Sequence, residues 1–135
     1  MKNINLPIGV FDSGLGGLTV LKALQKALPN ESFIYIGDTA HLPYGNKSKN
    51  SIISYSQYIG KYLISQKVKL IIIACNTASS VALPSLKRNF ETPIIDVITP
   101  IEDIIIRESK IKKIGIIGTY NTIQSHSYHK VLRRN

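Results

Sequence analysis

The stretch LIIIACNT, residues 70–77, decides the fold class, because a continuous apolar run ends there in polar and reactive side chains. Residues 70–74 predict a strand that is buried on both faces, as in the centre of a parallel sheet. Cys75, Asn76 and Thr77 follow at the carboxyl end of this strand. Open α/β sheets bind their ligands at that end, so the stretch predicts both a layered α/β fold and a candidate site.

Apolar runs alternate with amphipathic stretches on both sides of this strand. Further strands are predicted at residues 8–11, 33–36, 93–98 and 114–117. Helices are predicted at about 15–28, 52–63, 78–90 and 125–132, with another starting at Pro100. Asn50 or Ser51 is expected to cap the helix over 52–63. The repeated strand–helix units predict an α/β fold with a doubly wound parallel sheet.

A second polar motif, FDSGLGG at residues 11–17, follows the predicted first strand. Its glycines permit a tight turn and a close approach of ligand to backbone. Their spacing matches neither the dinucleotide fingerprint nor a P-loop. Asp12 and Ser13 are therefore expected at the same sheet edge as Cys75, with helix capping as the alternative role for both.

The thiol of Cys75 has two interpretations at this stage. It precedes a predicted helix, whose N-terminus favours negative charge and hence a thiolate that acts as nucleophile or general base. Free cysteines are also among the most buried residues, so Cys75 as a core residue is the alternative. The polar neighbours Asn76 and Thr77 suit an apolar cluster poorly and favour the functional interpretation.

The composition argues against several classes of protein. The 135 residues suit one domain, and they include no apolar run long enough for a membrane span and no signal-peptide core. The net charge of +9 comes from scattered lysines and arginines, which is typical of a solvated surface and not of a nucleic-acid site. The single cysteine excludes an internal disulfide and favours the cytoplasm. His41, His126 and His129 lack the spacing of a metal site.

Four sequence blocks in order resemble glutamate racemase, of the aspartate/glutamate racemase superfamily. The blocks are FDSGLGG (11–17), DTAHLPYG (38–45), ACNTAS (74–79) and GTYNT (118–122). The resemblance implies a cofactor-independent enzyme that interconverts L- and D-glutamate with two cysteines on opposite faces of the substrate α-carbon. It further implies that the enzyme supplies D-glutamate for peptidoglycan, and it leaves a homodimer open.

The resemblance also assigns roles to individual residues. Cys75 corresponds to the first catalytic cysteine, and Asp12 to the carboxylate that assists it. Substrate contacts are implied at Asp12, Ser13, Tyr44, Gly45, Asn76 and Thr77, with further contacts at Thr119 and Thr122.

One part of the family pattern is missing, because the sequence has no Gly-Cys-Thr-His motif and thus no second catalytic cysteine. The resemblance then implies the N-terminal portion of a racemase, from a fragment, a truncated gene or a degenerate copy. Residues 1–98 are expected to form most of the first α/β domain, and 99–135 to begin a second, similar domain. Two alternatives remain: a non-catalytic remnant that binds a ligand or partner, and an enzyme similar to aspartate racemase.

Overall fold

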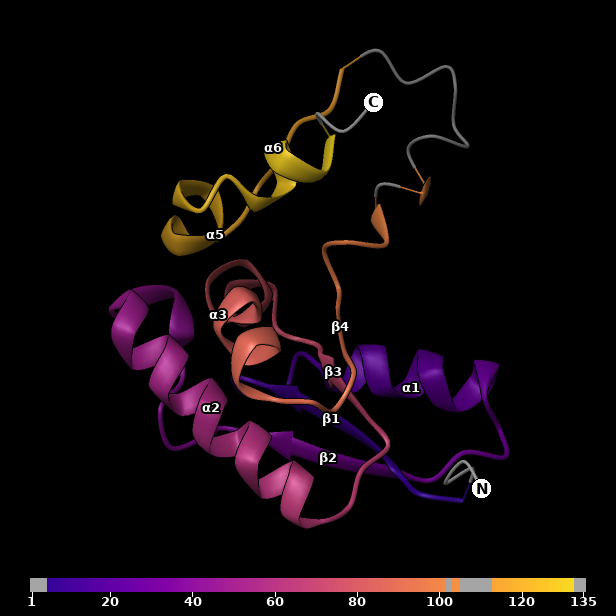
Figure 1. The fold of residues 1–135 in the computed structure, drawn as a ribbon. Coiled ribbons are helices and arrows are strands. Elements are labelled where there is room, and N and C mark those ends of the chain that lie inside the picture. The colour runs from indigo at the N-terminus through magenta and orange to yellow at the C-terminus, as the bar shows by residue number, and fades with distance from the viewer. Residues whose placement is uncertain (1–4, 102, 105–112, 133–135) are drawn as a thin grey trace.

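The structure is a computed structural model, which describes residues 5–101, 103–104 and 113–132. Its core is a parallel sheet. Four strands lie in the order β2-β1-β3-β4 (Figure 1). Their bounds are Ile8–Asp12 for β1, Phe33–Gly37 for β2, Leu70–Ile73 for β3 and Ile94–Asp96 for β4. This order matches a doubly wound sheet, so the predicted fold class is confirmed.

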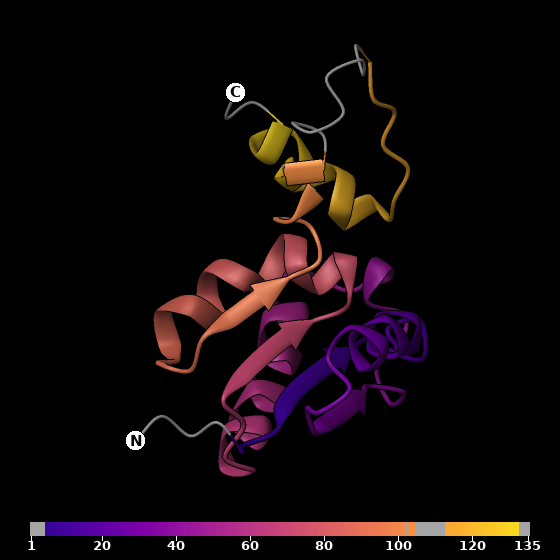
Figure 2. The ribbon, with the colours of Figure 1, turned by 90° about the vertical axis from the view of Figure 1, so that its right-hand side faces the viewer.

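Helices cover both faces of the sheet. Their bounds are Leu18–Ala27 for α1, Lys49–Ser65 for α2, Asn76–Asn89 for α3, Tyr120–Gln124 for α5 and Ser127–Leu132 for α6, with a short 3₁₀ helix η1 at Tyr44–Asn46. Figures 1 and 2 show α1 on one side of the sheet and α2 with α3 on the other. In the described part of the chain, none of the helices is long and apolar enough to cross a membrane.

The alternation of side chains along the strands divides the core into two clusters. Phe11, Ile71 and Ile73 face α2 and α3 and are fully buried. Val10 and Ile72 face α1 in a smaller cluster, which α1 covers only with partly buried side chains. The larger, better-packed cluster therefore lies beneath α3, the helix that begins directly after Cys75.

The C-terminal helices α5 and α6 lie beyond the carboxyl ends of the strands, against α3 (Figure 2). The Asn121 side chain donates to the carbonyl oxygens of Gly45 and Lys47 at 3.2 and 2.9 Å. The Ser127 hydroxyl donates to the carbonyl oxygen of Ser80 at 3.1 Å. These bonds attach α5 to the segment around η1 and α6 to α3.

One prediction for the C-terminal segment is wrong. Residues 114–117 form no strand, and Ile117 is fully exposed. A strand needs a neighbouring strand for its backbone hydrogen bonds. The described sheet ends at β4, so residues 114–117 have no such partner in it. The helix predicted over 125–132 is present as α6, Ser127–Leu132, and His126, with a φ of 53° in the left-handed region that a helix excludes, separates it from the preceding α5. The helix predicted from Pro100 falls largely on 102 and 105–112, outside the described residues.

The N-termini of two helices also differ from the predictions. Helix α1 begins at Leu18, so Leu15 belongs to the preceding turn and is exposed. Helix α2 is capped by Ser48 and not by Asn50 or Ser51. The Ser48 hydroxyl oxygen accepts a hydrogen bond from the Ser51 backbone N–H at 3.1 Å. Periodicity located both helices but not their first residues.

Replacing Ser48 tests the observed cap. Ser48→Ala removes the acceptor of the Ser51 N–H, so we expect the free energy of unfolding to fall by about 1 kcal/mol. Asn50→Ala, at an exposed position in the first turn of the same helix, is the matched control and should change it by less than about 0.5 kcal/mol. Urea unfolding measures both changes as shifts of midpoint at constant slope. Equal losses in the two variants would contradict the assignment.

Candidate functional site

The two polar motifs meet at the carboxyl edge of the sheet, on its two inner strands. β1 and β3 pair in parallel, with Phe11 opposite Ile73. The residues that follow each strand therefore emerge side by side. The Cys75 thiol donates to the Ser13 hydroxyl oxygen at 3.3 Å, across a sequence separation of 62 residues.

Cys75 is the N-cap residue of α3. Its backbone is extended, with φ −85° and ψ 120°, and its sulfur accepts a hydrogen bond from the Ala78 N–H at 3.4 Å. The residue is only 6% exposed. The sulfur thus lies at the N-terminus of α3, the positive end of the helix dipole. Cys75 is thus a member of the larger core cluster and also the residue at the helix end, and its chemical role stays a prediction.

Asp12 organises the turn that carries Ser13. One of its carboxylate oxygens accepts hydrogen bonds from the backbone N–H groups of Gly14 and Gly17, at 3.1 and 3.0 Å. Gly17 must be glycine, since a Cβ there would lie 2.5 Å from the Asp12 Cβ and 3.0 Å from that of Ala74. The carboxylate is buried. Asp12 therefore caps the turn before α1 and not the helix itself, whose N-cap residue Gly17 makes no side-chain cap hydrogen bond, so the helix-capping alternative is wrong for Asp12.

Three of the predicted threonines form a chain of hydroxyl groups. Thr77 Oγ1 lies 3.0 Å from Thr119 Oγ1, which lies 3.0 Å from Thr122 Oγ1. Thr119 also caps α5 by accepting from the Thr122 N–H at 3.4 Å. Thr77 and Thr122 are buried, whereas Thr119 is exposed. The chain joins the first turn of α3 to the start of α5.

Asn76 and Gly45 occupy different surroundings. Asn76 is exposed, and its side-chain oxygen accepts a hydrogen bond from the Tyr128 hydroxyl at 2.7 Å. Burial raises the pKa of Tyr128, and the nearby Asp96 carboxylate raises it further. Gly45 is buried against Thr119, because a Cβ at Gly45 would lie 2.8 Å from the Thr119 methyl carbon. Both residues thus contact the segment from 119 to 128.

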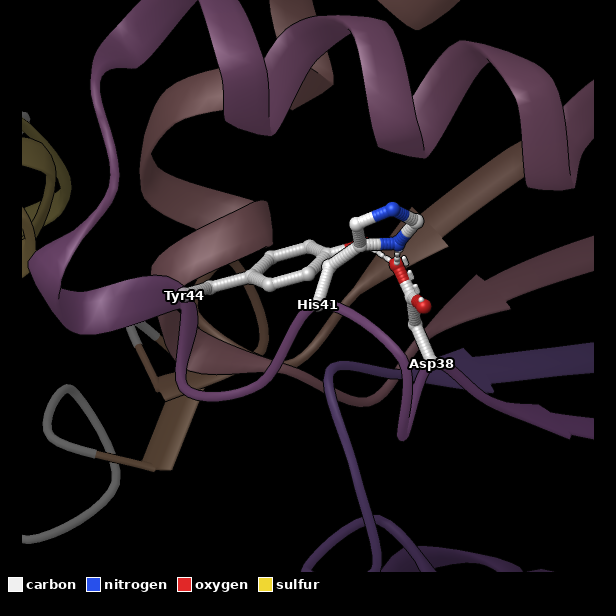
Figure 3. Close-up of polar contacts among 3 residues, drawn as sticks. All are labelled: Asp38, His41 and Tyr44. Carbon is white, nitrogen blue, oxygen red and sulfur yellow. Dashed lines mark hydrogen bonds and ion pairs between the residues drawn. The ribbon is translucent and has the colours of Figure 1, made fainter.

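Tyr44 points to a carboxylate that the sequence did not single out (Figure 3). Its hydroxyl donates to Asp38 at 2.7 Å, and His41 Nδ1 lies 2.8 and 2.9 Å from the two carboxylate oxygens of Asp38. The His41 ring stacks on Tyr55 at a centroid distance of 4.0 Å. Burial raises the pKa of Tyr44 far above its ordinary value, and the hydrogen bond to Asp38 and its charge add to this.

Two further residues near the site were absent from the predicted set. Asp38 follows β2 directly, at the same sheet edge as Asp12, and that position is the signal that points to it. Tyr35 lies within β2, and its hydroxyl donates to the Gly14 carbonyl oxygen at 3.0 Å. No sequence signal distinguishes it from the other tyrosines, since the contact depends on the pairing of β2 with β1.

Two cavities lie beside these residues. One of about 520 Å³ lies between β2, α2 and the loop after β2, and its lining includes Asp38, His41, Tyr55 and Tyr58. The other, of about 240 Å³, is lined by residues that include Ser80, Asp96, Ser127 and Lys130. Neither is lined by Cys75. Among the described residues, no group of three or more His, Cys, Asp or Glu side chains could hold a metal ion.

A pH above 10 should destabilise the fold through Tyr44. Its folded-state pKa lies above the ordinary value of 10.0, so the unfolded chain releases this proton first. The contribution is complete below pH 10 and is lost as the pH rises from there toward the folded-state pKa, by at most about 1.4 kcal/mol per pH unit. Tyr44→Phe should therefore flatten the fall of the unfolding free energy above pH 10, measured in urea at several pH values. An unchanged slope would contradict this role.

Comparison with known proteins finds this chain similar to glutamate racemases. It is 49% identical over 129 residues to the glutamate racemase of Aquifex aeolicus, a match of 96% of this chain and 51% of that protein. The crystal structure of the Thermus thermophilus glutamate racemase with β-chloro-D-alanine superposes with a TM-score of 0.89 at 45% identity, over 98% of this chain and 50% of the other. No family model matches the chain.

The glutamate racemase of Francisella tularensis, solved in complex with D-glutamate, gives a TM-score of 0.88 at 44% identity, over 96% of this chain and 48% of that one. This chain thus spans about half the length of the relatives it matches. Both sequence and fold agree over that half. The chain is accordingly homologous, over nearly its whole length, to an N-terminal portion of glutamate racemases.

Proposed function

We propose that this chain provides one thiol base and part of the glutamate-binding surface of a cofactor-independent glutamate racemase. The observation that carries the proposal is the position of Cys75, at the N-terminus of α3 and 3.3 Å from the Ser13 hydroxyl. The homology to glutamate racemases supports the same function. The complex of the Francisella tularensis relative with D-glutamate supports glutamate as the substrate, in preference to aspartate.

The proposed chemistry is a proton transfer at the substrate α-carbon. The Cys75 thiolate takes the α-proton and becomes a thiol, and the electron pair of the broken C–H bond moves into the substrate carboxylate. The intermediate is reprotonated on the opposite face by a second acid, which gives the mirror-image amino acid. Negative charge develops on the carboxylate in this step, so hydrogen-bond donors directed at it lower the barrier.

The donors for that charge are proposed from the residues around the thiol. Ser13 lies in contact with Cys75, and Thr77 belongs to the first turn of α3, beside Thr119. The N-terminal turn of α3, in which Asn76 is exposed, adds backbone N–H groups, which suit a carboxylate. Substrate contacts are proposed at the predicted positions Ser13, Tyr44, Gly45, Asn76, Thr77, Thr119 and Thr122. Asp12 is proposed to assist the thiol by fixing the turn that carries Ser13.

A single cysteine limits what this chain does by itself. Inversion requires an acid and a base on opposite faces of the α-carbon, and the sequence has one thiol. We therefore propose that the second thiol belongs to a second domain. Residues 99–135 would begin this domain, and residues 1–98, with Cys75, would face it across the substrate. The second candidate function is a non-catalytic module that binds glutamate, and the single cysteine is the observation that favours it.

The remaining parts of the proposal follow from the reaction. A thiol base must stay reduced, which suits the cytoplasm. D-glutamate made there would enter peptidoglycan. A homodimer is compatible with the exposed hydrophobic side chains of α2, Tyr58 and Tyr62.

Hydrogen exchange at the substrate α-carbon tests the proposed function. In D₂O, the 135-residue chain should exchange the α-hydrogen of one glutamate enantiomer for deuterium with retention of configuration, because one base serves one face. Little or no opposite enantiomer should form. Proton NMR follows the loss of the α-hydrogen, and chiral chromatography detects inversion.

Two variants complete this experiment. Cys75→Ala should abolish the exchange, whereas Ser65→Ala, at an exposed hydroxyl at the end of α2, should leave it unchanged. Inversion that depends on Cys75 would show that one thiol suffices and would refute the two-thiol mechanism. Binding of glutamate without exchange would favour the non-catalytic module.

A further inference from the structure

We propose that Tyr35 is a positioning residue that holds the turn from Asp12 to Gly17, and with it Ser13, against Cys75. The inference rests on the proposed function, in which this turn and the thiol share one site. Tyr35 itself touches neither Cys75 nor Ser13 through a hydrogen bond among the described contacts. Its action passes through the backbone of Gly14.

The position of Tyr35 follows from strand pairing. Tyr35 lies opposite Val10 in the parallel pair of β1 and β2. Its side chain packs with the cluster on the α1 face of the sheet, the face on which Val10 lies. From there its hydroxyl reaches past the end of β1 and donates to the Gly14 carbonyl oxygen at 3.0 Å. The bond joins residues 21 positions apart and fixes the turn to the neighbouring strand.

Close packing leaves this carbonyl little room to move. A Cβ at Gly37 would overlap the Gly14 carbonyl oxygen, so β2 approaches the turn as closely as glycine permits. A Cβ at Gly17 would lie 3.0 Å from the Tyr35 hydroxyl oxygen. The Tyr35 hydroxyl therefore lies close to two residues of the turn, Gly14 and Gly17.

The turn is thus held from two directions around Ser13. The Gly14 N–H donates to the Asp12 carboxylate at 3.1 Å, and the Gly14 carbonyl accepts from Tyr35. Ser13 directly precedes this doubly bonded residue and contacts Cys75 on its other side. Loss of the Tyr35 hydroxyl would release one of the two attachments and leave the Asp12 contact in place.

The electrostatic surroundings agree with a donor role. Burial raises the pKa of Tyr35, and the negative charges of Asp12 and Cys75 raise it further. The hydroxyl therefore keeps its proton and remains a donor at neutral pH.

Tyr35→Phe tests the proposal, because it removes one oxygen and keeps the ring in its apolar cluster. Cys75 is the only cysteine of the chain, so iodoacetamide reports on that one thiol. We expect Tyr35→Phe to accelerate alkylation several-fold, since a loosened turn exposes the sulfur. Tyr58→Phe, which removes a hydroxyl from an exposed ring on α2, is the matched control and should alkylate at the wild-type rate.

A double-mutant cycle separates positioning from a general loss of stability. If Tyr35 acts through the turn, its effect on alkylation should largely vanish in the Ser13→Ala background. The carbonyl carbon resonance of Gly14 should shift in Tyr35→Phe, while urea unfolding shows that the variant remains folded. Additive effects of the two substitutions, or an unshifted Gly14 carbonyl, would overturn the proposal.

Glutamate binding then distinguishes failure of this inference from failure of the proposed function. If the wild-type chain binds glutamate, titration calorimetry should show a several-fold weaker dissociation constant for Tyr35→Phe. Unchanged affinity would overturn the positioning role in the site. If the wild-type chain binds no glutamate, the proposed function fails, and the alkylation cycle and the Gly14 resonance still decide whether Tyr35 positions the turn.

Discussion

The parallel pairing of β1 with β3 is the constraint on which the candidate site depends. These inner strands end at the same edge, so the turn after Asp12 and the helix after Cys75 begin next to each other. A contact between Ser13 and Cys75, which lie 62 residues apart, then needs no long loop to span the distance. If one strand slipped by a residue, its side chains would change face and the two groups would separate.

The site residues are positioned mainly by backbone groups at strand and helix ends. Asp12 binds the N–H groups of its own turn, Cys75 accepts from the first turn of α3, and Thr119 accepts from the first turn of α5. Such capping contacts stabilise the fold and at the same time fix the reactive atoms. The structural and functional interpretations of these residues are therefore compatible. A substitution in the site is therefore expected to change both stability and chemistry.

The sequence was sufficient for the elements with strong local signals. The apolar run at 70–74 identified a central strand, and helical periodicity identified α1, α2 and α3. Local signals failed where the outcome depended on distant partners. Residues 114–117 have strand composition but no neighbouring strand among the described residues. The cap of α2 was misassigned because Ser48, Asn50 and Ser51 are all suitable cap residues within one helical turn.

By itself, the sequence determined the fold class, the sheet edge that carries the candidate site, and the residue types at that edge. It could do so because the periodicity of hydrophobic residues and the polar residues that follow each strand are local properties of the sequence. The tertiary structure alone decided which of those side chains meet. It placed Ser13 on Cys75, joined Thr77 to Thr119, bonded Tyr44 to Asp38, and brought Tyr35 under the turn from Asp12 to Gly17. These contacts join residues on different elements, so they depend on strand order and register, which no single stretch of the sequence contains.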